Sequence, residues 1–408
     1  MEKFILKVER HIRPAFGILL VILGWFVLHL FRRELLATRI WLICEKRNEA
    51  RDNGYHFYKY VREHHPEINC HYVIEQGAAD YPKVACLGNV IYADSFKHIL
   101  YYLAAERSIS SQAYGAFPYG FNRKELKIVE KFCNAEQRVV HLRHGVQKDA
   151  LAHSAFDYDK CNIDYLACSS KQEYEFIKNE YGYPEGTAGC VGLCRFDNLY
   201  AAGDKKEKIV LFMPTWRMWL KRRKDNVPLT EQEIENFYAS EFYEQFSYML
   251  GSEALLECLK EYGYKIYFYM HYQLQDYSEL FRAFESEHVV IADRHHYDVQ
   301  DLLMRASVLV TDFSSVQFDF AYMNKPLIYF QFDKDRFRSG HYKEGYFSYE
   351  DDGFGPCCMN AEDCVDELKQ IIIGDAKQPA IYQARANDFF AVRDDKNCSR
   401  TFDAVMSL

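Results

Sequence analysis

The chain has 408 residues, 49% of them hydrophobic and 27% charged, so it is long enough for two folded domains and too apolar for a disordered protein. Its net charge of -9 argues against a protein that wraps nucleic acid through an overall positive field. Thirteen cysteines without CxxC pairs indicate reduced thiols in a cytosolic compartment rather than a disulfide scaffold or a zinc site. We therefore expect a folded two-domain protein without a nucleic-acid partner.

The chain begins with an apolar segment of membrane-helix character. Residues 14–31 form an 18-residue run without Asp, Glu, Lys or Arg, and Arg13, Arg32 and Arg33 flank it. Eighteen residues just reach the length that crosses a bilayer as a helix, and the charges after the run do not resemble a signal-peptide cleavage site. We expect residues 1–34 to be a retained membrane anchor. A helix lying in the membrane interface and a buried core helix are the alternatives.

Residues 35–205 alternate short apolar runs with amphipathic stretches, which predicts a first domain of parallel strands and crossover helices. Helices are expected at 52–65 and 95–107, where apolar residues recur at helical spacing. The apolar runs predict strands at 40–44, 71–74, 90–93, 138–142 and 165–169.

A charged stretch after Gly203 interrupts this pattern, so we place the domain boundary there and a second domain at 206–408, with a closing C-terminal helix. Strands are predicted at 209–213, 265–270, 288–292, 307–310 and 326–330, and helices at 299–305 and 316–323. Two such domains facing each other leave a cleft at the carboxyl ends of their strands, where open parallel sheets bind ligands.

The most informative segment runs from 306 to 330, ASVLVTDFSSVQFDFAYMNKPLIYF. Its strand ends at Thr311, and Ser314 and Ser315 stand where the following helix begins. Free backbone N–H groups and small hydroxyls at a helix start suit a pyrophosphate, although serines also cap helices with no ligand. Asp319, one turn further, is expected either to reach a ribose hydroxyl or to be a structural partner.

A second motif, MPTWR at 213–217, follows the first strand of the second domain. The planar fork of Arg217 suits phosphate oxygens, and Trp216 is expected to be a packing residue. His271, directly after the strand at 265–270, is a further candidate for contacting phosphate charge.

A third motif, Arg143-His144-Gly145 with Lys148, follows the strand predicted at 138–142. A neutral imidazole at a strand end can take a proton from an attacking hydroxyl, and Gly145 leaves room for a substrate. A lone histidine is usually structural, so this interpretation depends on the other two motifs lying opposite.

Together these motifs resemble the CDP-glycerol glycerophosphotransferase family, the wall teichoic acid primases and polymerases. The resemblance rests on RHG at 143–145, PTWR at 214–217, His271 and TDFSSVQFDFAYMNKPLIYF at 311–330, with ARDNGYHFYKYV at 50–61 and DDKNCSR at 394–400. It implies an α/β fold with a GT-B-like pair of Rossmann-type domains. It also implies transfer of a glycerol phosphate or related polyol phosphate from a CDP-activated donor to an acceptor hydroxyl, with release of CMP, in teichoic acid or capsule-type synthesis.

The resemblance also implies roles for individual residues. His144 is the expected catalytic base, and Arg143, Gly145 and Lys148 are the expected acceptor contacts. The expected donor contacts are Arg217, His271, Thr311, Ser314, Ser315 and Asp319. The expected partners are a CDP-polyol donor, a lipid-linked or polyanionic polyol-phosphate acceptor and the membrane surface, with the catalytic body on the cytoplasmic side of a bacterial membrane.

Neither a metal nor another cofactor is expected. Asp333-Lys334-Asp335 imitates the DxD metal motif of other glycosyltransferases, but we expect an exposed acidic turn there. The basic run at 217–224, RMWLKRRK, is expected to guide a polyphosphate acceptor, to touch anionic lipid or to form a solvated face.

Three alternative functions remain open at this point. The first alternative is a ribitolphosphotransferase that uses CDP-ribitol, and the second is a GT-B glycosyltransferase that uses a UDP- or GDP-sugar. The third is a membrane-anchored assembly protein that catalyses no reaction. The two enzyme alternatives need the same cleft and phosphate-binding helix end, so the sequence does not separate them.

Overall fold

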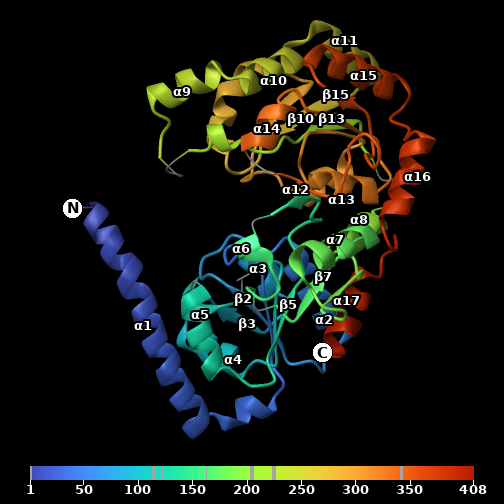
Figure 1. Cartoon of the computed structure of the whole chain (residues 1–408). Helices are drawn as coiled ribbons and strands as arrows, with labels where there is room; N and C mark the ends of the chain where they lie inside the picture. The colour runs from blue at the N-terminus through green and yellow to red at the C-terminus, as the bar shows by residue number, and fades with distance from the viewer. Residues whose placement is uncertain are drawn as a thin grey trace.

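The computed structural model describes residues 2–112, 116–120, 123–151, 153–161, 163–202, 206–222, 227–340 and 343–408. Figure 1 shows two lobes, each built on a parallel β-sheet with helices packed around it. We call the lobe with the seven-stranded sheet the first lobe and that with the six-stranded sheet the second lobe. The predicted α/β fold with two parallel sheets is therefore confirmed.

The sheet of the first lobe has the strand order β3-β2-β1-β4-β5-β7-β8, and every pair in it is parallel. Its strands are β1 (Trp41–Cys44), β2 (Cys70–Ile74), β3 (Val90–Tyr92), β4 (Arg107–Ser110), β5 (Arg138–His141), β7 (Tyr165–Ala167) and β8 (Ala188–Gly189). Its helices are α2 (Asn53–His64), α3 (Tyr81–Ala85), α4 (Phe96–Ala104), α5 (Arg123–Val129), α6 (His153–Phe156) and α7 (Lys171–Tyr181). The strand order reverses between β1 and β4, the point at which doubly wound sheets open a ligand crevice.

The sheet of the second lobe has the order β11-β10-β9-β12-β13-β15, again with parallel pairs only. Its strands are β9 (Ile209–Phe212), β10 (Lys265–Tyr269), β11 (Val289–Ala292), β12 (Val308–Thr311), β13 (Leu327–Phe330) and β15 (Cys357–Cys358). Its helices are α9 (Glu231–Tyr238), α10 (Glu241–Gly251), α11 (Glu253–Tyr262), α12 (Val299–Arg305), α13 (Val316–Tyr322), α14 (Lys334–Gly340) and α15 (Ala361–Ile373). Here the order reverses between β9 and β12.

Several elements connect the lobes. They are α8 (Phe196–Ala201), α16 (Ala380–Phe389), α17 (Asn397–Met406) and a two-stranded antiparallel sheet of β6 (Asp149–Ala150) and β14 (Lys343–Glu344). Five short 3-10 helices complete the described chain: Arg33–Ala37, Pro118–Gly120, Glu130–Phe132, Met218–Leu220 and Gln275–Phe284.

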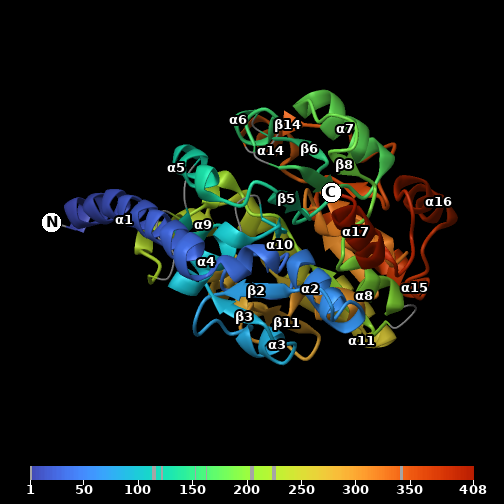
Figure 2. The ribbon, with the colours of Figure 1, turned by 90° about the horizontal axis from the view of Figure 1, so that it is seen from below.

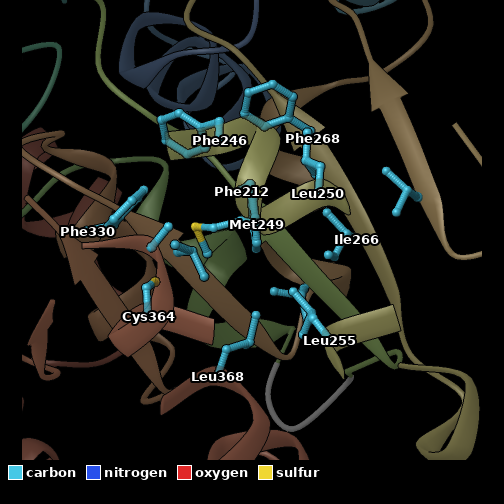
Figure 3. Packing of buried hydrophobic residues seen from close by; sticks show 14 of the residues in the cluster. Phe212, Phe246, Met249, Leu250, Leu255, Ile266, Phe268, Phe330, Cys364 and Leu368 are labelled. Carbon is cyan, nitrogen blue, oxygen red and sulfur yellow. The ribbon is translucent and has the colours of Figure 1, made fainter. Parts of the chain in front are cut away.

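One face of the second sheet is covered by α10, α11 and α15, and Figure 3 shows the side chains packed there. Phe212 and Phe268 point from the sheet, while Phe246 and Met249 come from α10 and Leu368 from α15. Burying each of these large side chains stabilises the fold by about 1.5–3 kcal/mol. Because helices cover both faces of the sheet, strands such as β9 and β12 are apolar throughout.

Strand β4 was not among the predicted strands, and its first residue fell inside the helix predicted at 95–107. The helix ends at Ala104, and Arg107–Ser110 forms a fully buried strand beside β1. The side chain of Arg107 donates from Nε to the Val405 carbonyl oxygen at 3.2 Å and forms an ion pair with Glu106 at 3.6 Å. These two contacts satisfy the buried guanidinium of Arg107. The strand is therefore buried although its sequence, RSIS, is polar enough to suggest an exposed segment.

Helix α17 returns from the second half of the chain to the first lobe. Phe402 stacks on His65 with ring centroids 3.6 Å apart and packs against Trp41 at 5.6 Å. The two sheets lie on either side of the boundary placed at 205/206, and residues 203–205 lie outside the described residues. The predicted second domain, 206–408, therefore ends in a helix that completes the core of the first lobe.

The apolar N-terminal run belongs to helix α1 (Glu2–Phe31), which lies along α4 and α5 in Figures 1 and 2. Val21, Gly24 and Leu28 face the first lobe, and a Cβ on Gly24 would lie 2.7 Å from Ile99 of α4. Among the residues that the structure describes, no helix combines the length and apolarity that a bilayer crossing requires. The predicted spanning anchor is therefore not supported, and these residues instead pack one face of α1 on the protein.

Candidate functional site

The predicted motifs lie at the carboxyl ends of strands next to the points where the strand orders reverse. Residues 214–217 follow β9 and residues 312–315 follow β12. Residues 143–145 follow β5 in the first lobe and meet the second lobe, because a Cβ on Gly145 would lie 2.8 Å from Ser315 Oγ. The RHG loop and the serine loop are thus in contact where the two lobes meet.

His144 presents an exposed imidazole at this contact, with 67% of its side chain accessible to solvent. Its Nδ1 lies 2.6 Å from Oδ2 of Asp52, which stands immediately before α2. Burial raises the pKa of Asp52, but the charges and hydrogen bonds of His144 and Arg195 outweigh burial and hold that pKa below its ordinary value. The ionised carboxylate keeps the imidazole proton on Nδ1 and leaves Nε2 as a proton acceptor.

The backbone of the RHG loop explains why His144 points outward. Arg143 adopts a left-handed φ of +66°, and its N–H donates to His141 Nδ1 at 2.8 Å. Burial lowers the pKa of His141 to about 3, so this imidazole stays neutral and can accept the bond. Asn53 Nδ2 donates to the Arg143 carbonyl oxygen at 2.9 Å, which ties the loop to α2.

Arg195 links this loop to the second lobe. Its Nη1 donates to Asp52 Oδ1 at 2.9 Å and to the His144 carbonyl oxygen at 2.7 Å. Its Nε and Nη2 donate to the two carboxylate oxygens of Asp319 at 2.5 and 2.9 Å. Asp319 is buried in this ion pair, so the structure favours the structural role that the sequence left open for it over a ribose contact.

Arg217 is fully buried, which differs from the predicted phosphate contact. Its Nε and Nη2 donate to Asp333 at 2.6 and 2.9 Å, and its Nη1 lies 2.8 Å from Asp312 Oδ2 and donates to the Thr215 carbonyl oxygen at 2.6 Å. The guanidinium thus ties together the loops after β9, β12 and β13. The exposed acidic turn predicted at 333–335 is wrong at Asp333, because that carboxylate is buried against Arg217.

The other predicted donor residues divide into two groups. Thr311 is buried, and its hydroxyl donates to the Met213 carbonyl oxygen at 2.8 Å. Ser314 and Ser315 are half-buried; Ser314 Oγ accepts from the Val316 N–H at 3.3 Å, and Ser315 makes no side-chain cap on α13. His271 follows β10 and is half-buried. Its ring stacks on that of Trp216, with the ring centroids 6.3 Å apart.

Two of the predicted acceptor residues point into the protein. Arg143 is buried, with its Nη2 bonded to Gln147 and 4.0 Å from Glu173 Oε1. Lys148 is buried beside Asp149, and burial lowers its pKa. Gly145 and Lys148 both lie against the opposite lobe: a Cβ on Gly145 would lie 2.8 Å from Ser315 Oγ, and Lys148 Nζ lies 5.4 Å from the centroid of the Tyr349 ring.

Sequence reasoning missed three residues that the structure brings to the site: Asp52, Arg195 and Asp312. Asp52 lay inside the ARDNGYHFYKYV segment and Asp312 inside the TDFSS segment, so both were within recognised motifs. Arg195 gave no such signal, because it lies in a short connection and its partners Asp52 and Asp319 are 143 and 124 residues away. Residues 223 and 224 of the predicted basic run lie outside the described residues.

Comparison with known proteins finds teichoic acid proteins among the relatives of this chain. Minor teichoic acid biosynthesis protein GgaB of Bacillus subtilis (strain 168) is 30% identical over 378 residues, which are 90% of this chain and 40% of GgaB. The teichoic acid glycerol-phosphate primase of the same organism is 25% identical over 218 residues, 51% of this chain and 49% of the primase. The chain thus covers less than half the length of these two relatives.

A solved structure of the wall teichoic acid polymerase TagF has the same fold. It superposes with a TM-score of 0.69 and 18% sequence identity, covering 100% of this chain and 99% of that one. The family model for CDP-Glycerol:Poly(glycerophosphate) glycerophosphotransferase matches residues 25–407. Because that match spans nearly the whole chain, the protein belongs to the CDP-glycerol:poly(glycerophosphate) glycerophosphotransferase family.

Proposed function

We propose that this chain transfers a glycerol phosphate, or a related polyol phosphate, from a CDP-activated donor to a hydroxyl of a lipid-linked or polymeric acceptor in teichoic acid or capsule-type synthesis. The observation that carries the proposal is the exposed His144, paired with Asp52 and lying beside the serine loop of the other lobe. Group transfer to a hydroxyl needs a proton acceptor next to the site of the donor phosphate. Family membership supports the identity of the donor.

In the proposed reaction, the acceptor hydroxyl gives its proton to His144 Nε2 as its oxygen attacks the donor phosphorus that bears glycerol. The new O–P bond forms while the bond from that phosphorus to the bridging oxygen of the diphosphate breaks. CMP leaves with the bonding electron pair, and Asp52 stabilises the imidazolium that forms. The rest of the site contributes positioning and charge stabilisation.

The two lobes divide the work in this proposal. The first lobe presents the acceptor side, and the second lobe holds the donor. His271, Ser314 and Ser315 are the proposed donor-phosphate contacts, because they are half-buried at the ends of strands that face the first lobe. Arg217, Thr311 and Asp319 support these loops from behind, as Arg143 and Lys148 support the RHG loop.

We further propose that α1 lies in the interface of the cytoplasmic leaflet, close to a lipid-linked acceptor. The helix packs one side on the first lobe and exposes a second apolar side at i, i+3 and i+7 spacing. The exposed residues are Phe16, Leu19, Leu23, Phe26 and Leu30. A lipid interface would cover this surface without requiring the helix to cross the bilayer.

A donor screen tests the proposed reaction. Purified chain is incubated with bacterial membranes and CDP-glycerol, CDP-ribitol or a UDP-sugar, and nucleotide release is measured. We expect CMP from a CDP-polyol, and His144→Ala should lower the rate on the order of 10²-fold or more. His296→Ala is the control, because His296 is also exposed and paired with a carboxylate, at 2.8 Å from Asp293.

Two results would contradict the proposal. Turnover of the UDP-sugar with neither CDP compound would favour a glycosyltransferase. If cells that carry His144→Ala still make the polymer, the chain would instead have an assembly role and catalyse no reaction.

A further inference from the structure

Arg195 stands immediately before α8, where the two lobes meet, and its side chain is largely buried. Both lobes also hold its backbone. The Arg195 N–H donates to Asn53 Oδ1 at 3.0 Å, and its carbonyl oxygen accepts from Gln300 Nε2 at 3.2 Å. Asn53 begins α2 in the first lobe, and Gln300 lies in α12 of the second. The backbone of Arg195 is therefore held by both lobes where they meet.

On the first-lobe side, Arg195 holds His144 twice. Its Nη1 donates to the His144 carbonyl oxygen at 2.7 Å and to Asp52 Oδ1 at 2.9 Å. The other oxygen of Asp52 lies 2.6 Å from His144 Nδ1. One guanidinium nitrogen thus contacts both the backbone of the base and the carboxylate that orients its ring.

On the second-lobe side, Asp319 accepts a two-pronged bond from Arg195 Nε and Nη2, at 2.5 and 2.9 Å. This geometry restricts the plane of the guanidinium more than a single contact does. Asp319 lies in α13, one turn after Ser315. The orientation of Arg195, and with it the contact to Asp52, therefore depends on the position of the donor-side helix.

We propose that Arg195 is a positioning residue that holds Asp52 and His144 in their reactive arrangement, and that it does so while Asp319 of the second lobe holds its guanidinium. The inference rests on the proposed function and deepens it. The catalytic base would be correctly held only when Asp319 of the second lobe contacts Arg195, so proton transfer would depend on the contact between the lobes.

The charges around Asp52 determine the expected effect of removing Arg195. Burial lowers the pKa of Arg195, but Asp319 and Asp52 outweigh it and raise the pKa, so the guanidinium stays charged. Around Asp52, burial and the charge of Asp52 raise the pKa of Glu45 to about 8, so Glu45 is mostly protonated at pH 7. Burial lowers the pKa values of His56 and His141 to about 4 and 3, so both are neutral at pH 7. Without Arg195, His144 would face Asp52 without a balancing cation.

Arg195→Met tests the inference through a pH profile. An unbalanced Asp52 stabilises the protonated imidazole, so the acid limb of kcat/KM should move to higher pH, by about one pH unit. We also expect kcat to fall by about 10- to 100-fold, since the ring is no longer held. Arg195→Lys keeps the charge but loses the fork, so it should retain the acid limb while kcat still falls.

A merely structural role would give a different pattern. Arg195→Met leaves Asp319 buried without its partner, and adding Asp319→Asn removes that buried charge. If Arg195 only stabilises the fold, this double variant should recover both stability and the wild-type pH profile. On our proposal it recovers stability alone. Arg305→Met is the matched control, because Arg305 makes the same fork on Glu207, at 2.7 and 3.0 Å, away from the site.

A second readout does not need turnover. NMR titration of the His144 imidazole, assigned with His144→Gln, should show its midpoint move to higher pH in Arg195→Met and stay unchanged in Arg305→Met. An unchanged midpoint in Arg195→Met would overturn the inference. Absence of CMP formation by the wild-type chain, with a shifted His144 midpoint, would instead count against the proposed function alone.

Discussion

At the scale of single residues, Arg217 shows how a phosphate-binding residue type can serve to build a site. An Arg directly after a strand end suggested a fork for donor oxygens. The structure gives that fork to Asp312 and Asp333 and encloses it in aromatic rings at 5.2–5.7 Å. Its contacts hold together the loops after β9, β12 and β13, including the loop that carries Ser314 and Ser315.

Replacing Arg217 should therefore cost stability. Arg217→Met leaves two buried carboxylates without their cation, and removal of one partner from a buried pair typically costs about 3–5 kcal/mol. Urea unfolding followed by circular dichroism measures this loss, with Arg305→Met as the partly exposed control. A variant of wild-type stability with a raised KM for the CDP donor would show that Arg217 contacts phosphate after all.

At the scale of elements, α1 combines two apolar faces with different roles. Val21 and Leu28 are buried against the first lobe, whereas Leu19, Leu23 and Phe26 are exposed. A helix with apolar residues on both its packed side and its exposed side has the composition of a spanning segment. The sequence pattern therefore does not distinguish a helix across the bilayer from one lying on it.

The exposed face of α1 should determine membrane binding. Leu19→Glu with Leu23→Glu places two charges on that face without touching the packed one, so we expect the chain to be lost from vesicles of anionic phospholipid. Flotation measures the bound fraction, and Ile381→Glu on α16 is the control, since Ile381 is also exposed. Equal flotation of the double variant and the wild type would contradict an interfacial α1.

The pairing of β6 with β14 joins the RHG loop to the second lobe. Asp149 pairs with Glu344 in register and accepts from Arg338 Nη1 at 2.6 Å. Gly345 lies so close to this strand that a Cβ there would overlap the Lys148 carbonyl oxygen. The position of the loop that carries His144 thus depends on a contact from the second lobe.

Gly345→Ala should disturb this contact and lower activity more than stability. The added methyl group must push β14 away from Lys148, which lets the RHG loop shift, and misplacement by about 1 Å can reduce a rate on the order of 10²-fold. Steady-state kinetics beside thermal unfolding would separate the two effects. Gly340→Ala is the control, since the nearest atom to its Cβ would be 3.9 Å away.

At the scale of the whole molecule, we expect the protein to lose stability in acid because of buried histidines in the first lobe. The first lobe contains four histidines that burial keeps neutral: His56, His71, His98 and His141, with pKa values lowered to about 4, 4, 4 and 3. In the unfolded chain they take up protons as the pH falls below about 6.5. The unfolded state therefore binds more protons, and stability should be lost between about pH 6.5 and pH 4.

His98→Gln tests this dependence. His98 accepts from the Asp94 N–H at 3.1 Å and has its Nε2 3.0 Å from the Ala116 carbonyl oxygen, contacts that a neutral amide can partly replace. Urea unfolding at pH 7 and pH 5 should show a smaller loss of stability in the variant than in the wild type. His296→Gln, which changes an exposed histidine, should leave the loss unchanged.

The contact between α17 and α8 also explains the DDKNCSR motif at 394–400, for which the sequence offered only a resemblance to a family. In DDKNCSR, Arg400 holds Asp394 at 2.8 and 2.9 Å, and Asn397 donates twice to Asp197 at 2.7 Å. Asp197 belongs to α8, so these bonds fix α17 against α8, which also connects the two lobes. The motif is therefore a structural joint, remote in sequence from α8 but adjacent to it in space.

The sequence by itself predicted the two parallel sheets, the strand ends that carry the motifs and a position of the RHG loop opposite the serine loop, and the structure brings these two loops into contact. Hydrophobic periodicity is a property of neighbouring residues, so it can be read along the chain. Only the tertiary structure decided what the charged residues do. Arg217 and Asp333 are 116 residues apart, and Arg195 and Asp319 are 124 apart. Whether an Arg meets a ligand or a buried carboxylate depends on such distant partners, which no local pattern records.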